Sequence, residues 1–487
     1  LKYKDFKPYV DYFNSMEDEN IAQAIPNARA SQWMEENIPL FECSQKNFEE
    51  MYYYRWWTLR KHIKETPVGY GMTEFLVNRS YADKYNLIAC AIGHHIYESR
   101  WLRNPEYLNQ IIHTWYRGNE GGPMAKMTKF SSWNADAVLG RYMVDGNKEF
   151  LLDMVKDLEA EYARWEKTNR LPNGLYWQGD VQDGMEESIS GGRRKQYARP
   201  TINSYMYGNA KALSLIGIMT GDEGMAMKYG LKADSIKTLV QDKLWNTDHH
   251  FFETMRGDAS AEVREAIGYI PWYFNLPDAS SKYTVAWKEV MDEKGFSAPY
   301  GLTTAERRHP EFRTHGVGKC EWDGAIWPFA SAQTLTAMAN FMNNYPQTVL
   351  TDSVYFHHME RYVESQHHRG RPYIGEYLDE VTGYWLKGDQ ERSRYYNHST
   401  FNDLMITGLI GLRPRMDNTV EVNPLIPEGK WDYFCLDNVL YHGRNLTILW
   451  DKDGSRYQRG KGLHIYVDGK EVGHADTLTR VLCENVL

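Results

Sequence analysis

Two glutamates, Glu186 and Glu376, lie in segments whose residue types are suited to sugar chemistry. Glu186 is in the run DGMEESISGG (183–192), and Glu376 is in the run IGEYLDEVTGYW (374–385). Hydrolysis of a glycosidic bond needs two carboxyl groups, one to protonate the leaving oxygen and one to activate water or attack the anomeric carbon. The two glutamates are 190 positions apart, so they can do this chemistry only if the fold brings them together.

The segment around Glu186 is dense in charged side chains. Asp183 and Glu187 flank Glu186, and neighbouring acids raise one another's pKa, as does a dry pocket. A carboxyl in such surroundings stays protonated near neutral pH and can act as a general acid. The candidate sugar-binding residues here are Trp177, Gln178 and Asp183. The alternative is a solvated loop whose acids are neutralised by its own arginines.

The segment around Glu376 combines a carboxylate with aromatic residues. A carboxylate that lies just before a tight turn and is flanked by tyrosines can hold a water molecule as a general base. The candidate binding residues in this segment are Tyr377, Trp385 and His398. The alternative is a polar loop that caps the next helix, with Thr400 or Asn402 as its N-cap.

A third aromatic segment, 300–335, lies between the other two. Trp322 and Trp327 flank a turn at the expected start of a helix. We expect Trp322, Asp323 and Trp327 to line the sugar site, since aromatic side chains stack on sugar faces and offer polar atoms at their edges. The alternative is ordinary aromatic packing at a helix start.

The composition argues against several classes of protein. The net charge of −9 is spread without a basic stripe, which argues against a nucleic-acid partner. No apolar run approaches the roughly 18–20 residues of a membrane span. The five cysteines show no CxxC spacing, so we expect neither a metal site nor a cofactor. A periplasmic or secreted location is favoured over a cytoplasmic one, and a monomer or small homo-oligomer is expected.

Helical patterns recur through most of the chain, at intervals of about 40–60 residues. They cover the segments 47–65, 83–99, 148–168, 203–221, 261–274, 327–345 and 352–369. Recurring helix pairs suggest stacked hairpins, in an open solenoid or in a closed toroid of about six hairpins. The long polar connections, rich in Gly, Trp and acidic residues, favour the closed form.

The pattern changes near Pro414. Short β-branched runs then alternate with turn signals, including Asp-Gly pairs at 453–454 and 468–469, which are typical of hairpins. We therefore predict a mainly α chain with an N-terminal lead-in segment (1–45), a helical catalytic domain (46–414) and a small C-terminal β-sandwich (415–487).

Six short motifs occur in the order found in the (α/α)6-barrel glycoside hydrolases that include processing α-glucosidase I, mannosylglycerate hydrolase and trehalase. The chain resembles this family between about 170 and 412. The motifs are DGMEES (183–188), LWNTDHHFF (244–252), GYIPWYF (268–274), GLTTAERRHPEF (301–312), WDGAIWP (322–328) and EYLDEVTG (376–383). The resemblance implies that the helical domain is an (α/α)6 barrel.

The resemblance also implies an activity. Such enzymes are exo-acting, inverting hydrolases, so one terminal, α-linked sugar would be removed from an oligosaccharide or glycoconjugate. It gives Glu186 the role of general acid and Glu376 that of general base, with the carboxyl groups about 6.5–9.5 Å apart. The chain departs from the family pattern in three places: Glu186 stands where relatives have Asp, Asp323 stands where they have Arg, and a longer loop, EESISGGRR (186–194), replaces their Asn-Ser-Pro-Arg after the acid.

Basic residues directly follow the acid motif. They suggest that an anionic group, such as a uronate or a glycerate, is bound near the site by bidentate donors. These residues are Arg193, Arg194 and Arg199. The alternative is that they form salt bridges with local acids.

Two other functions remain open at the level of sequence. Polysaccharide lyases also use helical toroids, with Tyr and His chemistry on uronates. A non-catalytic sugar-binding protein would keep its ligand affinity without either glutamate.

Overall fold

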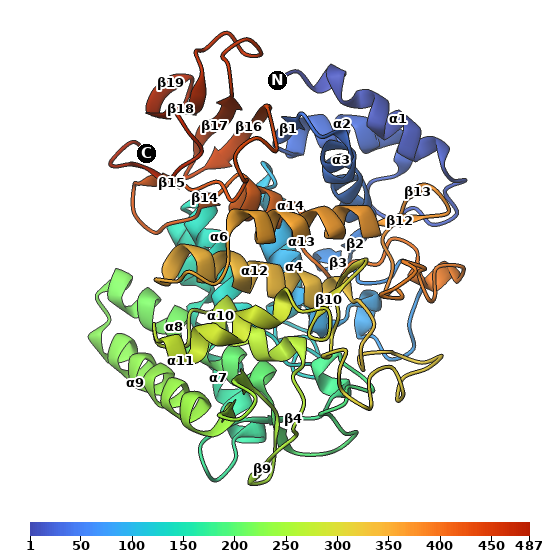
Figure 1. Cartoon of the computed structure of the whole chain (residues 1–487), viewed down its shortest axis with the longest axis vertical. Coiled ribbons are helices and arrows are strands. Elements are labelled where there is room, and N and C mark those ends of the chain that lie inside the picture. The colour runs from blue at the N-terminus through green and yellow to red at the C-terminus, as the bar shows by residue number, and fades with distance from the viewer.

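The computed structural model describes residues 1–487, and helices make up most of its regular structure. Six helices form a ring, because each contacts the next and the last contacts the first. In chain order they are α4 (Ile92–Ser99), α6 (Asn134–Asp145), α8 (Pro200–Thr220), α10 (Ile270–Tyr273), α12 (Pro328–Asn344) and α14 (Asn402–Leu404). They lie at the centre of the molecule (Figure 1).

A second set of helices alternates with the ring helices along the chain. It comprises α3 (Lys46–Lys61), α5 (Pro105–Arg117), α7 (Lys148–Asn169), α9 (Glu223–Leu239), α11 (Ser281–Thr284) and α13 (Asp352–Ser365). Several begin at a capping side chain: Asn104 accepts a hydrogen bond from the Glu106 amide, and Asp222 accepts one from the Met225 amide, which satisfies otherwise unpaired helix donors. Because the chain returns through an outer helix each time, the ring helices run parallel.

The helical segments predicted from sequence are largely present. The patterns at 47–65, 148–168, 203–221, 327–345 and 352–369 coincide with α3, α7, α8, α12 and α13. The segment 83–99 is helical only in its second half, since Tyr85 and Asn86 adopt positive φ angles of 63° and 66° that an α-helix does not accommodate. The segment 261–274 contains only short helical turns, and α5, α6 and α9 were not predicted.

The N-terminal segment packs on the helices and also contributes a strand. Helices α1 (Lys7–Ser15) and α2 (Asn27–Asn37) both contact α3. Strand β1 (Leu40–Cys43) pairs antiparallel with β16, with Phe41 opposite Leu436. Part of the predicted lead-in segment therefore belongs to the C-terminal sheet.

The C-terminal region contains two sheets, seen beside α2 and α3 in Figure 1. The first has the order β1-β16-β17-β18-β19, and the second β14-β15-β20. Their strands are β14 (Leu412–Arg413), β15 (Val420–Val422), β16 (Tyr433–Tyr441), β17 (Arg444–Asp451), β18 (Gly462–Val467), β19 (Lys470–Ala475) and β20 (Val481–Cys483). Asp468 and Gly469 form the predicted hairpin turn, with φ angles of 47° and 79°. The other Asp-Gly pair lies in a longer β17–β18 connection.

Long loops precede the ring helices and carry the remaining short strands. These are β2 (Ile63–Thr66), β3 (Gly69–Met72), β4 (Trp177–Gln178), β5 (Tyr197–Ala198), β6 (Trp245–Asn246), β7 (Phe251–Phe252), β8 (Met255–Arg256), β9 (Ala259–Ser260), β10 (Ser297–Ala298), β11 (Gly301–Leu302), β12 (His367–His368) and β13 (Arg371–Pro372). Since the ring helices are parallel, these loops gather at their N-terminal ends. No helix is both long and apolar enough to cross a membrane.

Candidate active site

Glu186 lies in the loop before α8, just after a short 3-10 turn (Val181–Asp183) that ends at Gly184 with a φ of 72°. The side chain is partly buried. Burial is the main cause that raises the pKa of Glu186 to about 7; the negative charges of Asp180 and Glu376 add to the rise, and Arg193 opposes it. Near neutral pH this carboxyl therefore holds a proton in a large fraction of molecules.

Glu376 lies in the loop before α14 and is buried, with 3% of its surface exposed. Its Oε1 accepts hydrogen bonds from Arg392 Nη2 at 2.6 Å, Arg392 Nε at 3.0 Å and Ser393 Oγ at 3.2 Å. Its Oε2 lies 3.4 Å from Lys387 Nζ. Two cations and a hydroxyl all stabilise the charged form, so Glu376 is held as a carboxylate.

The two glutamates lie within reach of each other's charge. The Glu376 charge contributes to the raised pKa of Glu186. The charges of both glutamates also affect the thiol of Cys320. Burial raises the pKa of this thiol to about 12, and the charges of Glu186 and Glu376 contribute to the rise. Residues 190 positions apart in the chain thus meet at one site, one carboxyl near its titration point and the other ionised.

A third carboxyl, Glu74, was missed by the sequence analysis. It is buried in the loop before α4, accepts a hydrogen bond from the Tyr396 hydroxyl, and lies 3.1 Å from the Cys90 thiol, which donates to it. Burial raises the pKa of Glu74 to about 7, and the charges of Glu376 and Glu186 contribute. It was missed because it is an isolated acid next to Phe75, without a motif around it.

Three stacked aromatic rings form a wall near Glu376. Trp322 stacks on Trp327 with centroids 4.4 Å apart, and Trp327 stacks on Tyr377 at 4.5 Å. The Tyr377 hydroxyl donates to the Lys319 carbonyl. His398 lies against Trp327 at 6.1 Å, and burial holds its pKa well below its usual range, so its ring is neutral. The structure thus brings these four predicted residues together.

Three other predicted site residues, Asp183, Arg199 and Asp323, make their contacts within the loops. Asp183 accepts from Arg199 Nε at 2.6 Å, and both side chains are fully buried. Asp323 accepts the amides of His315 at 2.6 Å and Gly316 at 3.0 Å. These contacts brace the backbone, so the positions of Asp183, Arg199 and Asp323 do not fit the direct substrate contacts predicted for them.

Five further predicted residues have mixed surroundings. Trp385 is buried and its Nε1 donates to the Ser365 carbonyl at 3.1 Å, a contact that supports the loop. Gln178 is buried and Trp177 partly buried in the short β4 strand. Arg193 is exposed and pairs with Glu187 at 2.9 Å, and Arg194 is exposed beside it. The local salt bridge weighed as an alternative is therefore present for Arg193.

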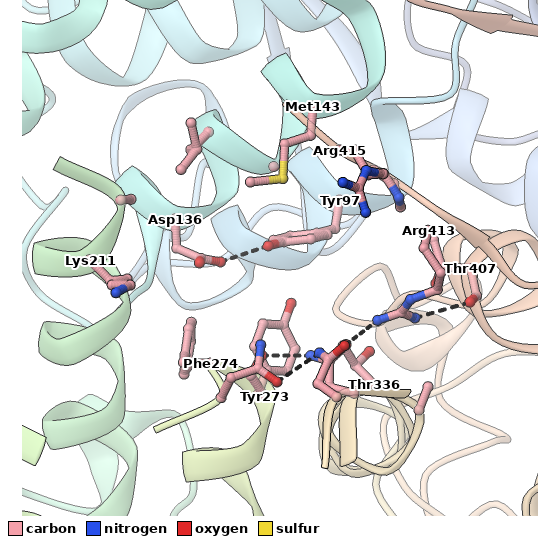
Figure 2. Close-up of a pocket in the computed structure, with 18 of the residues that line it drawn as sticks. Tyr97, Asp136, Met143, Lys211, Tyr273, Phe274, Thr336, Thr407, Arg413 and Arg415 are labelled. Atoms are coloured by element: carbon pink, nitrogen blue, oxygen red, sulfur yellow. Dashed lines mark hydrogen bonds between the residues drawn. The ribbon is translucent and has the colours of Figure 1, made fainter. Parts of the chain in front are cut away.

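A cavity of about 690 Å³ lies elsewhere and contains neither Glu186 nor Glu376 (Figure 2). Its lining residues come from within or after the ring helices, among them Asp136, Tyr207 and Asn340. The glutamates precede those helices, so the cavity is at the opposite end of the ring. Cavity size alone would favour this far end, but the pair of carboxyls in different protonation states favours the N-terminal end as the catalytic one.

Residues 84–399 match the family model of the mannosylglycerate hydrolase MGH1-like glycoside hydrolase domain, and residues 412–474 match the C-terminal domain of glycosyl hydrolase family 65. A solved structure named a sialidase is 84% identical, with a TM-score of 0.99; the match covers 100% of this chain and 45% of that one. The chain therefore spans less than half of that relative.

More distant structures share the fold. The GH63 mannosylglycerate hydrolase from Thermus thermophilus in complex with glucose is 12% identical with a TM-score of 0.53, covering 73% of this chain and 99% of that one. The GH78 family rhamnosidase of a Bacillus species is 11% identical with a TM-score of 0.58, covering 85% of this chain and 40% of that one.

Proposed function

The chain belongs to the mannosylglycerate hydrolase MGH1-like glycoside hydrolase family, and we propose that within it this chain is an exo-acting, inverting hydrolase. It removes a terminal sugar from an oligosaccharide or glycoconjugate. Glu186 is the general acid that protonates the leaving oxygen, and Glu376 is the general base that activates water. Cleavage of the bond and attack by water on the opposite face then occur together.

The contrast between the two glutamates carries this proposal. Burial without a cation partner in hydrogen-bond contact keeps the pKa of Glu186 near 7, which suits a group that must give up a proton near neutral pH. Arg392 and Ser393 hold Glu376 ionised, which suits a group that must accept a proton from water. Acid and base roles can be assigned to two carboxyl groups when their surroundings favour different protonation states.

The arrangement of the helices supports the inverting mechanism, because it fits the fold of a family of inverting enzymes. A closed ring of six parallel helices with an outer helix in each connection fits an (α/α)6 barrel, the architecture of the family. An inverting enzyme leaves room for water, so we expect the carboxyls of Glu186 and Glu376 to lie about 6.5–9.5 Å apart in the complex with substrate.

The stacked wall of Trp322, Trp327 and Tyr377 supports a sugar-sized subsite beside Glu376, because aromatic faces pack against sugar rings. The sugar itself is open to experiment, since the related structures bear the names of enzymes for different sugars. Arg193 and Arg194 are exposed next to the acid loop and are placed to attract an acidic group on the substrate.

A panel of aryl glycosides and oligosaccharides tests the proposal. Wild-type protein should release a single terminal sugar from at least one of them. The variants Glu186→Gln and Glu376→Gln should lose most of that activity and keep the wild-type circular dichroism and melting temperature. A product that absorbs in the ultraviolet through a new double bond would instead identify a lyase, and full activity in either variant would overturn the acid and base roles of the two glutamates.

A further inference from the structure

The cavity on the side of the ring away from the loops of Glu186 and Glu376 is built by the whole ring. Every ring helix or the turn after it lines the cavity, and β14 and β15 close one side. Its volume of about 690 Å³ is within the range of pockets that hold small molecules. Because every ring helix contributes to the lining, the shape of the cavity depends on the packing of the whole ring.

Most of the cations around this cavity already have partners within the chain; Lys211, which also lines it, is exposed. Arg100 pairs with Asp403 at 2.8 Å, and Arg415 pairs with Glu421 at 2.8 Å. Arg413 donates to the Thr407 carbonyl at 3.1 Å and to Asn340 Oδ1 at 2.6 Å. Arginines that bind carbonyls here also complement the negative ends of the helix dipoles. The arginines of the cavity are therefore already engaged, and Lys211 is the lining cation with no ion pair or hydrogen bond within the chain.

Asp136 is the acid of the cavity that lacks a cation partner. Its Oδ2 accepts from the Tyr97 hydroxyl at 2.6 Å, a contact visible in Figure 2, and its Oδ1 makes no hydrogen bond within the chain. The Tyr207 hydroxyl likewise makes none, and the rings of Tyr97, Tyr207 and Phe274 line the same space. A carboxylate acceptor, a hydroxyl and aromatic faces are the groups that bind a neutral sugar.

We propose that this cavity is a second carbohydrate site, separate from the catalytic one, that binds a neutral sugar of one or two rings. A sugar hydroxyl would donate to Asp136 Oδ1, and the ring would pack against Tyr97 and Phe274. The proposal goes beyond the hydrolytic function and does not depend on it, since none of its groups belongs to the loops that carry Glu186 and Glu376.

The methyl groups of two methionines allow the cavity and the catalytic end of the ring to be observed separately. Met143 lines the cavity, whereas Met185 is the neighbour of Glu186. In protein labelled with 13C-methyl methionine, Met143→Leu and Met185→Leu assign the two NMR signals. Titration is done with D-glucose, D-mannose and L-rhamnose, and with D-glucuronate as the anionic probe. We expect the Met143 signal to shift saturably with at least one neutral sugar.

The variants Asp136→Asn and Tyr207→Phe locate the binding groups. Each should weaken the sugar response of Met143 by about fivefold or more without changing that of Met185; Tyr207→Phe serves if Asp136→Asn does not fold. A Met143 signal that no neutral sugar moves, unchanged affinity in both variants, or a tighter response to D-glucuronate would each overturn the proposal.

Discussion

The two ends of the helix ring carry similar residues in different arrangements. Each has a carboxyl with a raised pKa, about 7 for Glu186 and about 6 for Asp136, with burial as the first cause of both shifts. At the catalytic end, the second carboxylate, Glu376, is held ionised by Arg392 and lies close enough to influence Glu186. At the far end, Asp403 is likewise paired with a cation, Arg100, but its charge is not among the causes of the Asp136 shift. A raised pKa is thus not enough to mark a catalytic site; the two carboxyl groups must also lie close enough to influence each other.

The largest effect should come from removing the base. Glu376→Gln takes away the group that accepts the proton of water, so kcat should fall by about 10³–10⁴-fold. Asp352→Asn is a matched control, because it also replaces a carboxyl group by an amide but lies at the start of α13. Steady-state kinetics should give wild-type kcat for the control. A loss of less than tenfold in Glu376→Gln would remove the base assignment.

The acid should be distinguishable from the base by the leaving group. Glu186→Gln should lower kcat by about 10²–10³-fold for a poor leaving group. The loss should shrink for an aryl glycoside with an acidic phenol, which leaves without a proton. Wild-type kcat should also decline as the pH rises above about 7, where Glu186 loses its proton, and this decline should vanish in the variant. Equal losses for both substrates would contradict the acid role.

Arg392 should affect the activity of the base, Glu376, without itself taking part in proton transfer. Arg392→Met removes the 2.6 Å contact to Glu376, so the carboxylate loses its nearest cation. We expect kcat to fall about tenfold. Lys387→Met is the control, since its contact is 3.4 Å, and it should lower kcat much less. Equal kcat in wild type and Arg392→Met would refute this.

The smallest effect concerns stability and the third carboxyl. Glu74 has a pKa of about 7 in the folded chain against an ordinary value of 4.5. Between these values the folded state binds the proton more tightly than the unfolded state does, so the free energy of unfolding falls as the pH rises. Glu74→Gln lacks this dependence. Its stability relative to wild type should therefore grow by about 2–3 kcal/mol from pH 4.5 to 7; a constant difference in urea titrations would contradict the shift.

The sequence predicted the helical core better than the site. Apolar periodicity located α3, α8 and α12, since their burial is nearly continuous. It missed α9, in which the buried residues are Met225, Tyr229, Ala233 and Ile236, and α6, whose buried residues include the polar Asn134 and Arg141. The pair Glu186 and Glu376 could be proposed from the sequence because local motifs surround each one. Glu74 was not found, because only the fold places it beside them.

The basic residues of the acid loop show why composition misleads. Arg199 and Arg193 look equivalent in sequence, yet Arg199 is buried against Asp183 while Arg193 is exposed and pairs with Glu187. Which arginine finds an internal partner depends on the path of the loop between Gly184 and α8. Sequence spacing does not determine that path, so the anion-binding set could not be assigned from it.

The stereochemistry of the first product tests the central claim most directly. With the substrate that the panel identifies, proton NMR recorded within the first minutes shows the anomer released before mutarotation. If Glu376 activates water while Glu186 protonates the leaving group, the new reducing sugar must appear with inverted configuration. Release of the retained anomer would mean that a carboxylate attacks carbon directly, and it would contradict the role of Glu376 as a general base that activates water.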